Sequence, residues 1–207
     1  MAETDYEFTA DWFSINRPMW DQLVGPLRPS RIVEIGCYEG RATCYLIEAC
    51  SVHQAVELHC IDTWEGGDVN DPAVMPAVER RFDRNVGLAR KKAAHPVKLK
   101  KYKEASNRAL LRIAAAEDPS SFDLAYIDGS HQAPDVLVDA VLAFQLVRPG
   151  GLMIFDDYVW FMEPEGKHDA FNMPKPAIDA FVNVFQRKLH IVRGAPLYQL
   201  YVEKLSD

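Results

Sequence analysis

The fold of this chain is decided by ten residues near its start, RIVEIGCYEG (Arg31–Gly40). An apolar run that ends in Glu34 predicts a buried strand, Gly36 and Gly40 follow it, and residues 42–49 have the composition of a helix. Because glycine has no side chain, a strand–turn–helix of this kind lets the backbone pass close to a nucleotide-like ligand. The stretch therefore predicts a ligand-binding turn at the end of a buried strand.

Outward from this turn, strand-like and helix-like segments alternate. The predicted strands cover 32–35, 58–61, 97–102, 123–127 and 152–155, and the predicted helices between them cover 42–50, 77–93, 107–116 and 134–147. The alternation favours an α/β fold with a Rossmann-like, doubly wound, mostly parallel sheet. After a helix at 177–186, extended segments at 190–193 and 197–203 predict an antiparallel hairpin at the sheet edge, which makes seven strands.

At 207 residues the chain is long enough for one domain with a full core. We expect residues 1–30 to form an N-terminal helical extension and residues 31–207 to form the domain itself. The extension contains Pro18 and three aromatic residues, Trp12, Phe13 and Trp20. They suggest a short helix packed near the sheet or near the mouth of the site.

The net charge of −7 argues against general nucleic-acid binding, which depends on neutralising phosphates with Lys and Arg. Basic residues gather between Arg80 and Lys103, where ten Lys or Arg accompany a single acid, Asp83. This stretch indicates either a solvated helix face with its following strand or a patch for an anionic substrate or partner.

The four cysteines show no CxxC spacing, which argues against a zinc knuckle or a thioredoxin-like motif. The first residues are acidic and lack the apolar core of a signal peptide, and no apolar run approaches the ~20 residues of a membrane span. We therefore expect a reduced cytoplasmic protein that binds neither nucleic acid nor membrane.

Polar residues lie at or just beyond the ends of the five predicted parallel strands: Glu34, Asp62, Ser106, Asp128 and the pair Asp156-Asp157. Ligands of open α/β sheets bind beyond the carboxyl ends of the strands, so these side chains are expected to share one site. Three carboxylates crowded together repel one another unless a cation lies between them, and oxygen ligands suit Mg²⁺, Mn²⁺ or Ca²⁺ rather than zinc. In a metal-free alternative, Asp128 and Asp156 only cap loops by hydrogen bonds.

Five short motifs occur in order along the chain: EIGCYEG (34–40), IDTWEGG (61–67), YIDGSH (126–131), RPGG (148–151) and FDDY (155–158). Together they resemble class I S-adenosylmethionine-dependent methyltransferases. They are most similar to the small metal-dependent O-methyltransferases of the catechol and macrocin types. The match runs from about residue 31 to residue 203, and the closing helix and hairpin also suit that fold.

The resemblance implies a binding role for each part of the predicted site. The methionine end of S-adenosylmethionine would be held by Glu34 and the turn Gly36, Tyr38 and Gly40. The ribose would be held by Asp62, whose carboxylate can accept both hydroxyl hydrogens, and by Thr63. The adenine would lie near Ser106 and Asn107, and Asp128 would also contact the cofactor.

The resemblance also implies a divalent cation, most simply Mg²⁺, held by Asp128, Asp156 and Asp157. The catechol branch has Asp-Asn where this chain has Asp156-Asp157, whereas the macrocin branch has the double acid. That difference favours a sugar-type or unusual hydroxyl acceptor over a catechol.

His131 stands where the catechol-type enzymes have a lysine that serves as general base. An unperturbed histidine, with a pKa near 6.5, suits proton abstraction at neutral pH. His131 is therefore a candidate base, together with Asp128 as the second catalytic residue. Metal ligation or a structural capping role are the alternatives for the histidine.

The sequence thus predicts transfer of a methyl group from S-adenosylmethionine to a hydroxyl of a small molecule, assisted by a divalent cation. The alternatives are a metal-independent or nitrogen-directed methyltransferase, a nicotinamide-dependent oxidoreductase and a non-catalytic cofactor-binding module. The ExGxxxG spacing and the lack of an obvious Tyr-x-x-x-Lys pair count against the oxidoreductase.

Two segments are expected to border the mouth of the site. The aromatic, proline-bounded segment 158–176 is predicted to be a substrate lid, a flap folded on the core or a dimer contact. The aromatic N-terminus suggests a homodimer. Residues 68–72 are predicted to form a second wall.

Overall fold

Seven strands form a single sheet in the order β3-β2-β1-β4-β5-β7-β6 in the computed structural model, which describes residues 6–66 and 70–207. The strands are β1 (Arg31–Ile35), β2 (Val56–Asp62), β3 (Val97–Lys103), β4 (Phe122–Ile127), β5 (Val147–Phe155), β6 (Leu189–Ile191) and β7 (Leu200–Lys204). The first five are parallel, and β7 runs antiparallel to both β5 and β6. The predicted α/β fold class is confirmed.

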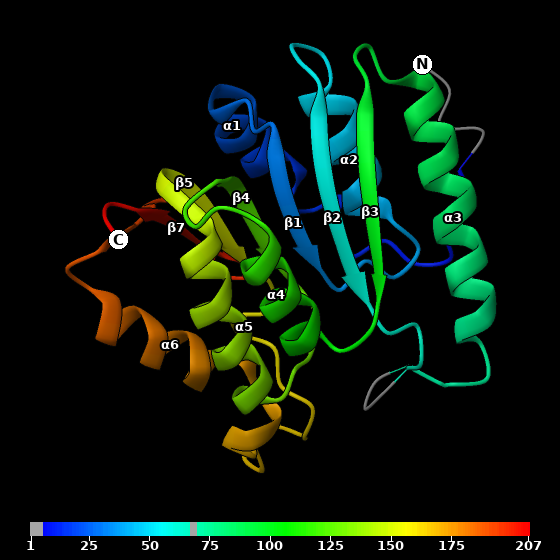
Figure 1. The fold of residues 1–207 in the computed structure, drawn as a ribbon. Coiled ribbons are helices and arrows are strands. Elements are labelled where there is room, and N and C mark those ends of the chain that lie inside the picture. The colour runs from blue at the N-terminus through cyan, green and yellow to red at the C-terminus, as the bar shows by residue number, and fades with distance from the viewer. Residues whose placement is uncertain (1–5, 67–69) are drawn as a thin grey trace.

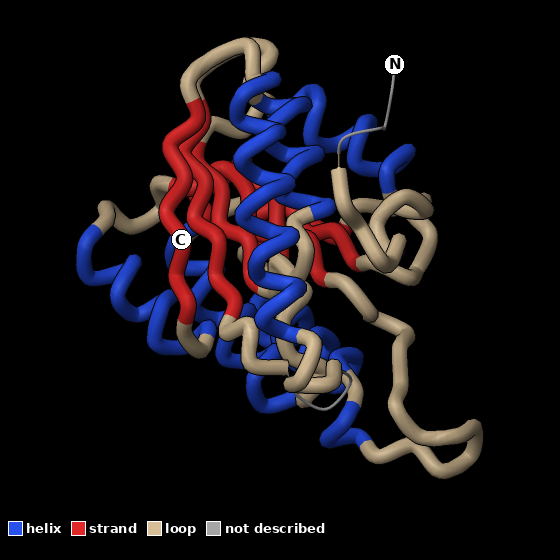
Figure 2. Tube along the Cα trace, turned by 90° about the vertical axis from the view of Figure 1, so that its right-hand side faces the viewer, coloured by secondary structure: helices blue, strands red, loops and turns tan. Residues whose placement is uncertain are grey.

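Helices cover both faces of the sheet, as Figures 1 and 2 show. They are α1 (Arg17–Leu27), α2 (Arg41–Cys50), α3 (Met75–Lys92), α4 (Ser106–Ala116), α5 (Ala133–Leu146) and α6 (Pro174–Phe185), with a short 3₁₀ helix η1 (Ala170–Asn172) before α6. One hydrophobic cluster joins α1, α2 and α3 to the sheet, and the other joins α4, α5 and α6 to its opposite face. This is the doubly wound arrangement, in which both faces of the central strands are buried.

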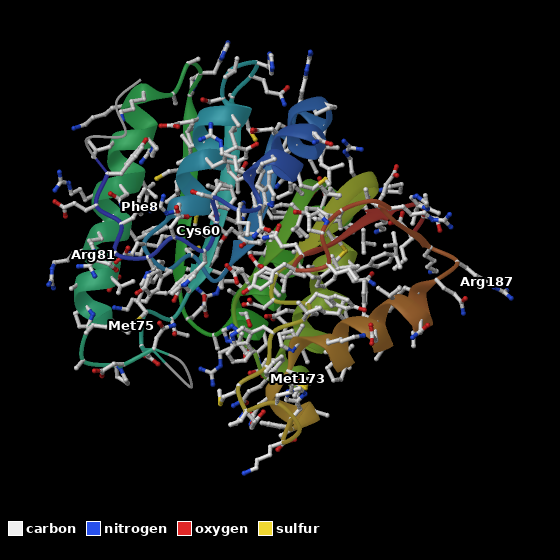
Figure 3. All side chains as sticks on the ribbon, turned by 180° about the vertical axis from the view of Figure 1, so that it is seen from behind. Phe8, Cys60, Met75, Arg81, Met173 and Arg187 are labelled. Carbon is white, nitrogen blue, oxygen red and sulfur yellow. The ribbon has the colours of Figure 1, made fainter. Side chains whose placement is uncertain are left out.

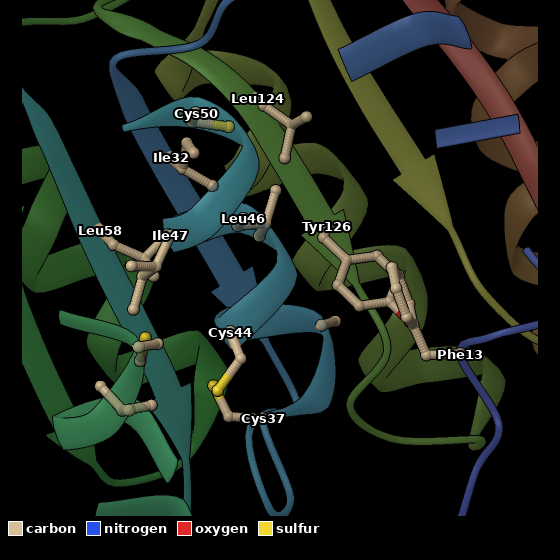
Figure 4. Packing of buried hydrophobic residues seen from close by; sticks show 14 of the residues in the cluster. Phe13, Ile32, Cys37, Cys44, Leu46, Ile47, Cys50, Leu58, Leu124 and Tyr126 are labelled. Atoms are coloured by element: carbon tan, nitrogen blue, oxygen red, sulfur yellow. The ribbon is translucent and has the colours of Figure 1, made fainter. Parts of the chain in front are cut away.

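The central strands are apolar because both of their faces are covered. In Figure 4, Leu46 and Ile47 of α2 lie over Ile32 of β1 and Leu58 of β2, and all four side chains are fully buried. Such two-sided burial explains why the last four residues of β1 are all buried instead of alternating between buried and exposed.

The end of the sheet differs in detail from the predicted edge hairpin. Strand β7 lies between β5 and β6, so β6 is the only one of the two hairpin strands at an edge of the sheet. Strand β5 begins at Val147 rather than at 152, because its register against β4 shifts and residues 148–151 bulge out within the strand. Glycine allows the bulge: Gly150 has φ +76°, and a Cβ on Gly151 would lie 2.6 Å from Val147 Cγ1.

The N-terminal segment contains the expected helix, α1, and packs on the sheet. Trp20 is fully buried, and its ring meets the rings of Phe13 and Tyr126 edge-on at centroid distances of 4.9 and 4.8 Å. The four cysteines are buried free thiols. Among the described residues, no helix is both long and apolar enough to cross a membrane.

The basic stretch is largely engaged in ion pairs with acids that come from elsewhere in the chain. On edge strand β3, Lys101 and Lys103 lie 2.9 and 2.6 Å from Glu79, and Lys100 lies 2.8 Å from Glu57 and 2.6 Å from Glu117. Lysines on an exposed strand edge also oppose pairing with another chain. These contacts favour the solvated-face interpretation over an anion-binding patch.

Candidate functional site

A cavity of about 600 Å³ opens at the carboxyl ends of the parallel strands. Its lining contains most of the predicted site residues: Gly36, Tyr38, Asp62, Thr63, Ser106, Asn107, Asp128, His131, Asp156 and Asp157. They come from the ends of β1, β2, β4 and β5 and from the start of α4, which the topology brings to one edge of the sheet. Neither Glu34 nor Gly40 is among its lining residues.

The turn at residues 36–40, here called the cofactor loop after the role predicted for it, passes very close to the end of β4. Gly36 has φ +82°, and a Cβ on it would lie 1.9 Å from the carbonyl oxygen of Asp128. Only glycine fits such an approach, so the loop can lie flat against the end of the next strand. Gly40 instead caps the start of α2 with φ +80°, and a Cβ there would lie 3.0 Å from Phe82.

Asp62 holds the cofactor loop from the end of β2. Its Oδ2 accepts hydrogen bonds from the backbone N–H groups of Cys37 and Tyr38, both at 2.9 Å, and its Oδ1 accepts from Trp64 N at 2.7 Å. Burial raises the pKa of Asp62, whereas these three N–H donors oppose the shift. Asp62 therefore has a structural role in holding this loop. Its predicted contact with a ribose stays a prediction.

Glu34 lies beneath the cofactor loop rather than in the cavity. Its side chain is fully buried, and burial, with a smaller contribution from the charge of Asp62, raises its pKa to about 8. A carboxyl group in this position is mainly protonated at neutral pH. The predicted contact of Glu34 with the methionine end of a cofactor stays a prediction.

Three carboxyl groups meet on the other side of the cavity. Ligand oxygens of Asp128, Asp156 and Asp157 lie within 4.8 Å of one another. Burial and repulsion from the neighbouring acids raise the pKa of Asp128 well above its usual range and the pKa of Asp156 to about 6. A set of oxygen ligands that repel one another fits a hard divalent cation, which would favour the ionised forms of Asp128 and Asp156.

A shell of buried polar residues, not foreseen from the sequence, orients these acids. The Tyr126 hydroxyl lies 2.8 Å from Asp128 Oδ2 and also contacts Asp156 Oδ2. The Gln199 amide donates to the same Asp156 oxygen at 2.7 Å, and its own Oε1 accepts from Trp20 Nε1 at 2.8 Å and Tyr201 Oη at 2.6 Å. Of these partners, only Tyr126 lies near an acid of the cluster in the sequence, two residues before Asp128. Trp20 of α1 and Tyr201 of β7 are brought to the site only by the fold.

His131 is fixed beside the acid cluster. Its Nε2 lies 2.8 Å from Asp157 Oδ2, and Tyr198 donates to Asp157 Oδ1 at 2.8 Å. The indole of Trp160 covers the imidazole at a centroid distance of 4.2 Å. If Nε2 carries the hydrogen of this bond, Nδ1 is the nitrogen that can accept a proton.

Aromatic residues from both ends of the chain complete the cavity. Trp12 lies on Tyr38 at a centroid distance of 5.0 Å, and Trp160 and Tyr198 lie near the acid cluster. Of the segments expected to border the mouth, 158–176 therefore contributes Trp160. Residues 68 and 69 of the predicted second wall lie outside the described residues, and Asn70 lines the cavity.

The charges along the described lining are all negative unless His131 is protonated. Six carboxyl groups face the cavity, and no Lys or Arg does: Asp62, Glu104, Asp128, Asp135, Asp156 and Asp157. Such a lining attracts cations and repels anions.

Comparison with known proteins agrees with this geometry. A family model described as "Methyltransferase domain" matches residues 33–158. The uncharacterized protein y4gI of Sinorhizobium fredii is 28% identical over 145 residues, which are 67% of this chain and 14% of that protein, so the chain spans only a small part of this curated relative.

Solved structures show the same fold. The O-methyltransferase from Bacillus cereus, in complex with S-adenosylhomocysteine (SAH), has a TM-score of 0.64 at 19% identity, over 95% of this chain and 84% of that one. TomG from Streptomyces achromogenes, in complex with S-adenosylmethionine, has a TM-score of 0.65 at 17% identity, over 99% of this chain and 83% of that one. MycE of mycinamycin biosynthesis, in complex with Mg and SAH, has a TM-score of 0.59 at 19% identity, over 97% of this chain and 51% of that one. The resemblance predicted from the motifs is confirmed.

Proposed function

The chain belongs to the methyltransferase-domain family, and from this premise we propose that it moves a methyl group from S-adenosylmethionine to a hydroxyl of a small molecule, with a divalent cation at the acid cluster. One observation carries the proposal. A glycine loop held by Asp62 and a cluster of three carboxyl groups, Asp128, Asp156 and Asp157, line the same cavity. A cofactor and a cation bound there would lie side by side.

The residues present fit both groups. The cofactor loop borders the cavity at Gly36 and Tyr38, and the acid cluster offers oxygen ligands. Burial and repulsion between the acids raise the pKa values of Asp128 and Asp156, and a cation between them would offset that repulsion. When bound, S-adenosylmethionine supplies an electrophilic methyl group on a sulfonium, and a divalent cation supplies a charge that lowers the pKa of an acceptor hydroxyl.

The protein's own residues would then align the reactants and move one proton. Tyr126 and Gln199 hold Asp128 and Asp156 in a fixed orientation, so that the cluster presents its remaining lone pairs to the cavity. His131, oriented by Asp157, takes the acceptor proton at Nδ1. Walls formed by Trp12 and Trp160 limit the entry of water.

The acidic lining of the cavity limits the charge that a methyl acceptor can carry. With six carboxyl groups and no Lys or Arg among the described lining residues, an acceptor carrying phosphate or carboxylate groups would be repelled. We therefore propose a neutral or cationic hydroxylated acceptor.

A metal-independent methyltransferase, with oxygen or nitrogen as acceptor, is the second candidate. One observation favours it: the acid cluster already receives hydrogen bonds from Tyr126, Gln199, Tyr198 and His131. A cytoplasmic location and a homodimer stay predictions of the sequence.

Calorimetric titration of SAH with and without Mg²⁺ tests the proposal on wild type, on Asp156→Asn/Asp157→Asn and on Asp135→Asn, an acid of the same cavity outside the cluster. We expect all three proteins to bind SAH, and only the double variant to lose Mg²⁺ binding. No SAH binding by wild type would refute the proposed function. SAH binding with no Mg²⁺ effect in wild type would favour the metal-independent candidate.

A further inference from the structure

Residues 7–12, here called the N-terminal strap, run across the cofactor loop and are fastened to it. Thr9 donates twice to the carboxylate of Glu39 within the loop, from its backbone N to Oε2 at 2.6 Å and from Oγ1 to Oε1 at 2.7 Å. Glu39 is only 2% exposed, and its other side-chain partner is Arg81 of α3 at 2.5 Å. A carboxylate this deeply buried is costly unless it is paired, so the strap supplies part of what keeps Glu39 stable.

Helix α3 provides a second fastening. Asn85 is fully buried, accepts from Glu7 N at 2.8 Å, and donates to the carbonyl oxygens of Glu7 at 3.0 Å and Glu39 at 2.9 Å. One side chain thus joins the strap, α3 and the cofactor loop. Figure 3 shows Phe8 beside α3, on which Arg81 lies.

Arg41, the first residue of α2, provides a third attachment of the strap. Its Nε donates to the carbonyl oxygen of Ala10 at 3.2 Å, and its guanidinium lies 4.2 Å from the centre of the Phe8 ring. The strap is therefore fixed at Glu7, Phe8, Thr9 and Ala10 before it reaches the cavity.

The last residue of the strap enters the cavity wall. The Trp12 indole lies against Tyr38, a residue of the cofactor loop, and both line the cavity. Trp12 is nevertheless 61% exposed, whereas tryptophan side chains are on average highly buried. A ligand bound against the loop would cover this free face.

We propose that the N-terminal strap forms a wall of the cofactor-binding end of the cavity, in which Trp12 is a further binding residue for S-adenosylmethionine and Glu39 is a positioning residue that acts through Thr9. This inference rests on the proposed function. Because the strap and the cofactor contact the same loop, each stabilises the other, and the coupling is reciprocal.

Two measurements with SAH as the probe test it. Calorimetry compares wild type with Trp12→Ala, which removes the wall, Trp12→Phe, which keeps an aromatic ring, and Thr9→Val, which removes one bond to Glu39. Ile15→Ala is the matched control, because Ile15 is 81% exposed and does not line the cavity. We expect Trp12→Ala to weaken SAH binding about tenfold, which corresponds to about 1.4 kcal/mol. Trp12→Phe should restore most of the affinity, Thr9→Val should weaken binding a few-fold, and Ile15→Ala should bind like wild type.

Hydrogen exchange supplies a readout that is independent of affinity. In wild type, SAH should slow exchange of the Thr9 and Glu7 amides, and Trp12→Ala should reduce that protection. If wild type binds SAH but Trp12→Ala binds it within twofold of wild type, or if the strap amides are not protected, the strap inference is wrong while the proposed function stands. Absence of SAH binding in wild type would instead refute the proposed function.

Discussion

Gln199 donates a 2.7 Å hydrogen bond from its side-chain amide to Oδ2 of Asp156, across 43 residues of sequence. Both side chains are buried, and two donors on Oε1 of Gln199 determine which way its amide points. Asp156 is thereby held in one orientation before any ligand binds. Partners of this kind commonly tune the affinity of a metal site.

We therefore predict that Gln199→Leu weakens Mg²⁺ binding by roughly 10- to 100-fold. Binding of SAH without Mg²⁺ should stay within a few-fold of wild type, because Gln199 does not line the cavity. Calorimetry measures both affinities, and Gln186→Leu, at an exposed position after α6, is the control. Unchanged Mg²⁺ affinity would show that Gln199 has no part in orienting the cluster.

Gly36→Ala should abolish SAH binding and destabilise the protein. A Cβ at this position would lie 1.9 Å from the Asp128 carbonyl oxygen, and the φ of +82° is unfavourable for alanine. We expect a loss on the order of 3 kcal/mol or more in the free energy of unfolding. Gly87→Ala, within α3 and with no atom within 4 Å of its added Cβ, should instead gain up to about 1 kcal/mol. Denaturant unfolding compares the two variants; equal effects would contradict this view of the loop.

Asp139 on α5 should make stability depend on pH. It is 1% exposed, one of its oxygens has no hydrogen-bond partner, and burial raises its pKa to about 7 from an ordinary 3.8. An acid whose pKa is raised on folding destabilises the protein progressively as pH rises from the unfolded value to the folded value. Stability should therefore fall between about pH 4 and pH 7 through this group.

Asp139→Asn should remove that fall, so that its advantage over wild type is absent near pH 4 and reaches a few kcal/mol at pH 8, by the size of the pKa shift. Thermal or urea unfolding across this range measures the effect. Asp118→Asn, at an exposed position after α4, is the control. Parallel pH profiles for wild type and Asp139→Asn would contradict the assignment.

His131→Ala should lower the rate of methyl transfer by roughly 10²–10⁴-fold, as expected for loss of a general base. The affinity for SAH should change little. The rate is measured with an acceptor found by screening neutral and cationic hydroxylated molecules, and His131→Gln, which keeps a donor toward Asp157, controls for orientation. Near-normal turnover of His131→Ala across pH would leave the histidine with a structural role only.

Several features of this protein follow from the sequence alone. Alternating apolar segments and helices predict the α/β sheet, because hydrophobic periodicity is a local property of the chain. The acids at the ends of β2, β4 and β5 are predicted to meet, since parallel strands present their carboxyl ends at one edge. The need for glycine at position 36 is likewise visible in the strand–turn–helix pattern.

Tertiary packing decided the rest. Sequence spacing does not show that Glu34 is fully buried beneath the loop, or that Asp139 is buried rather than exposed. Burial depends on which elements cover a residue. The contacts of Gln199 with Asp156 and of Thr9 with Glu39 join segments 43 and 30 residues apart. Such partners come together only when the whole sheet and its helices are assembled, and no local pattern records them. Motifs therefore predicted where the candidate site lies, and packing determined how its residues are held.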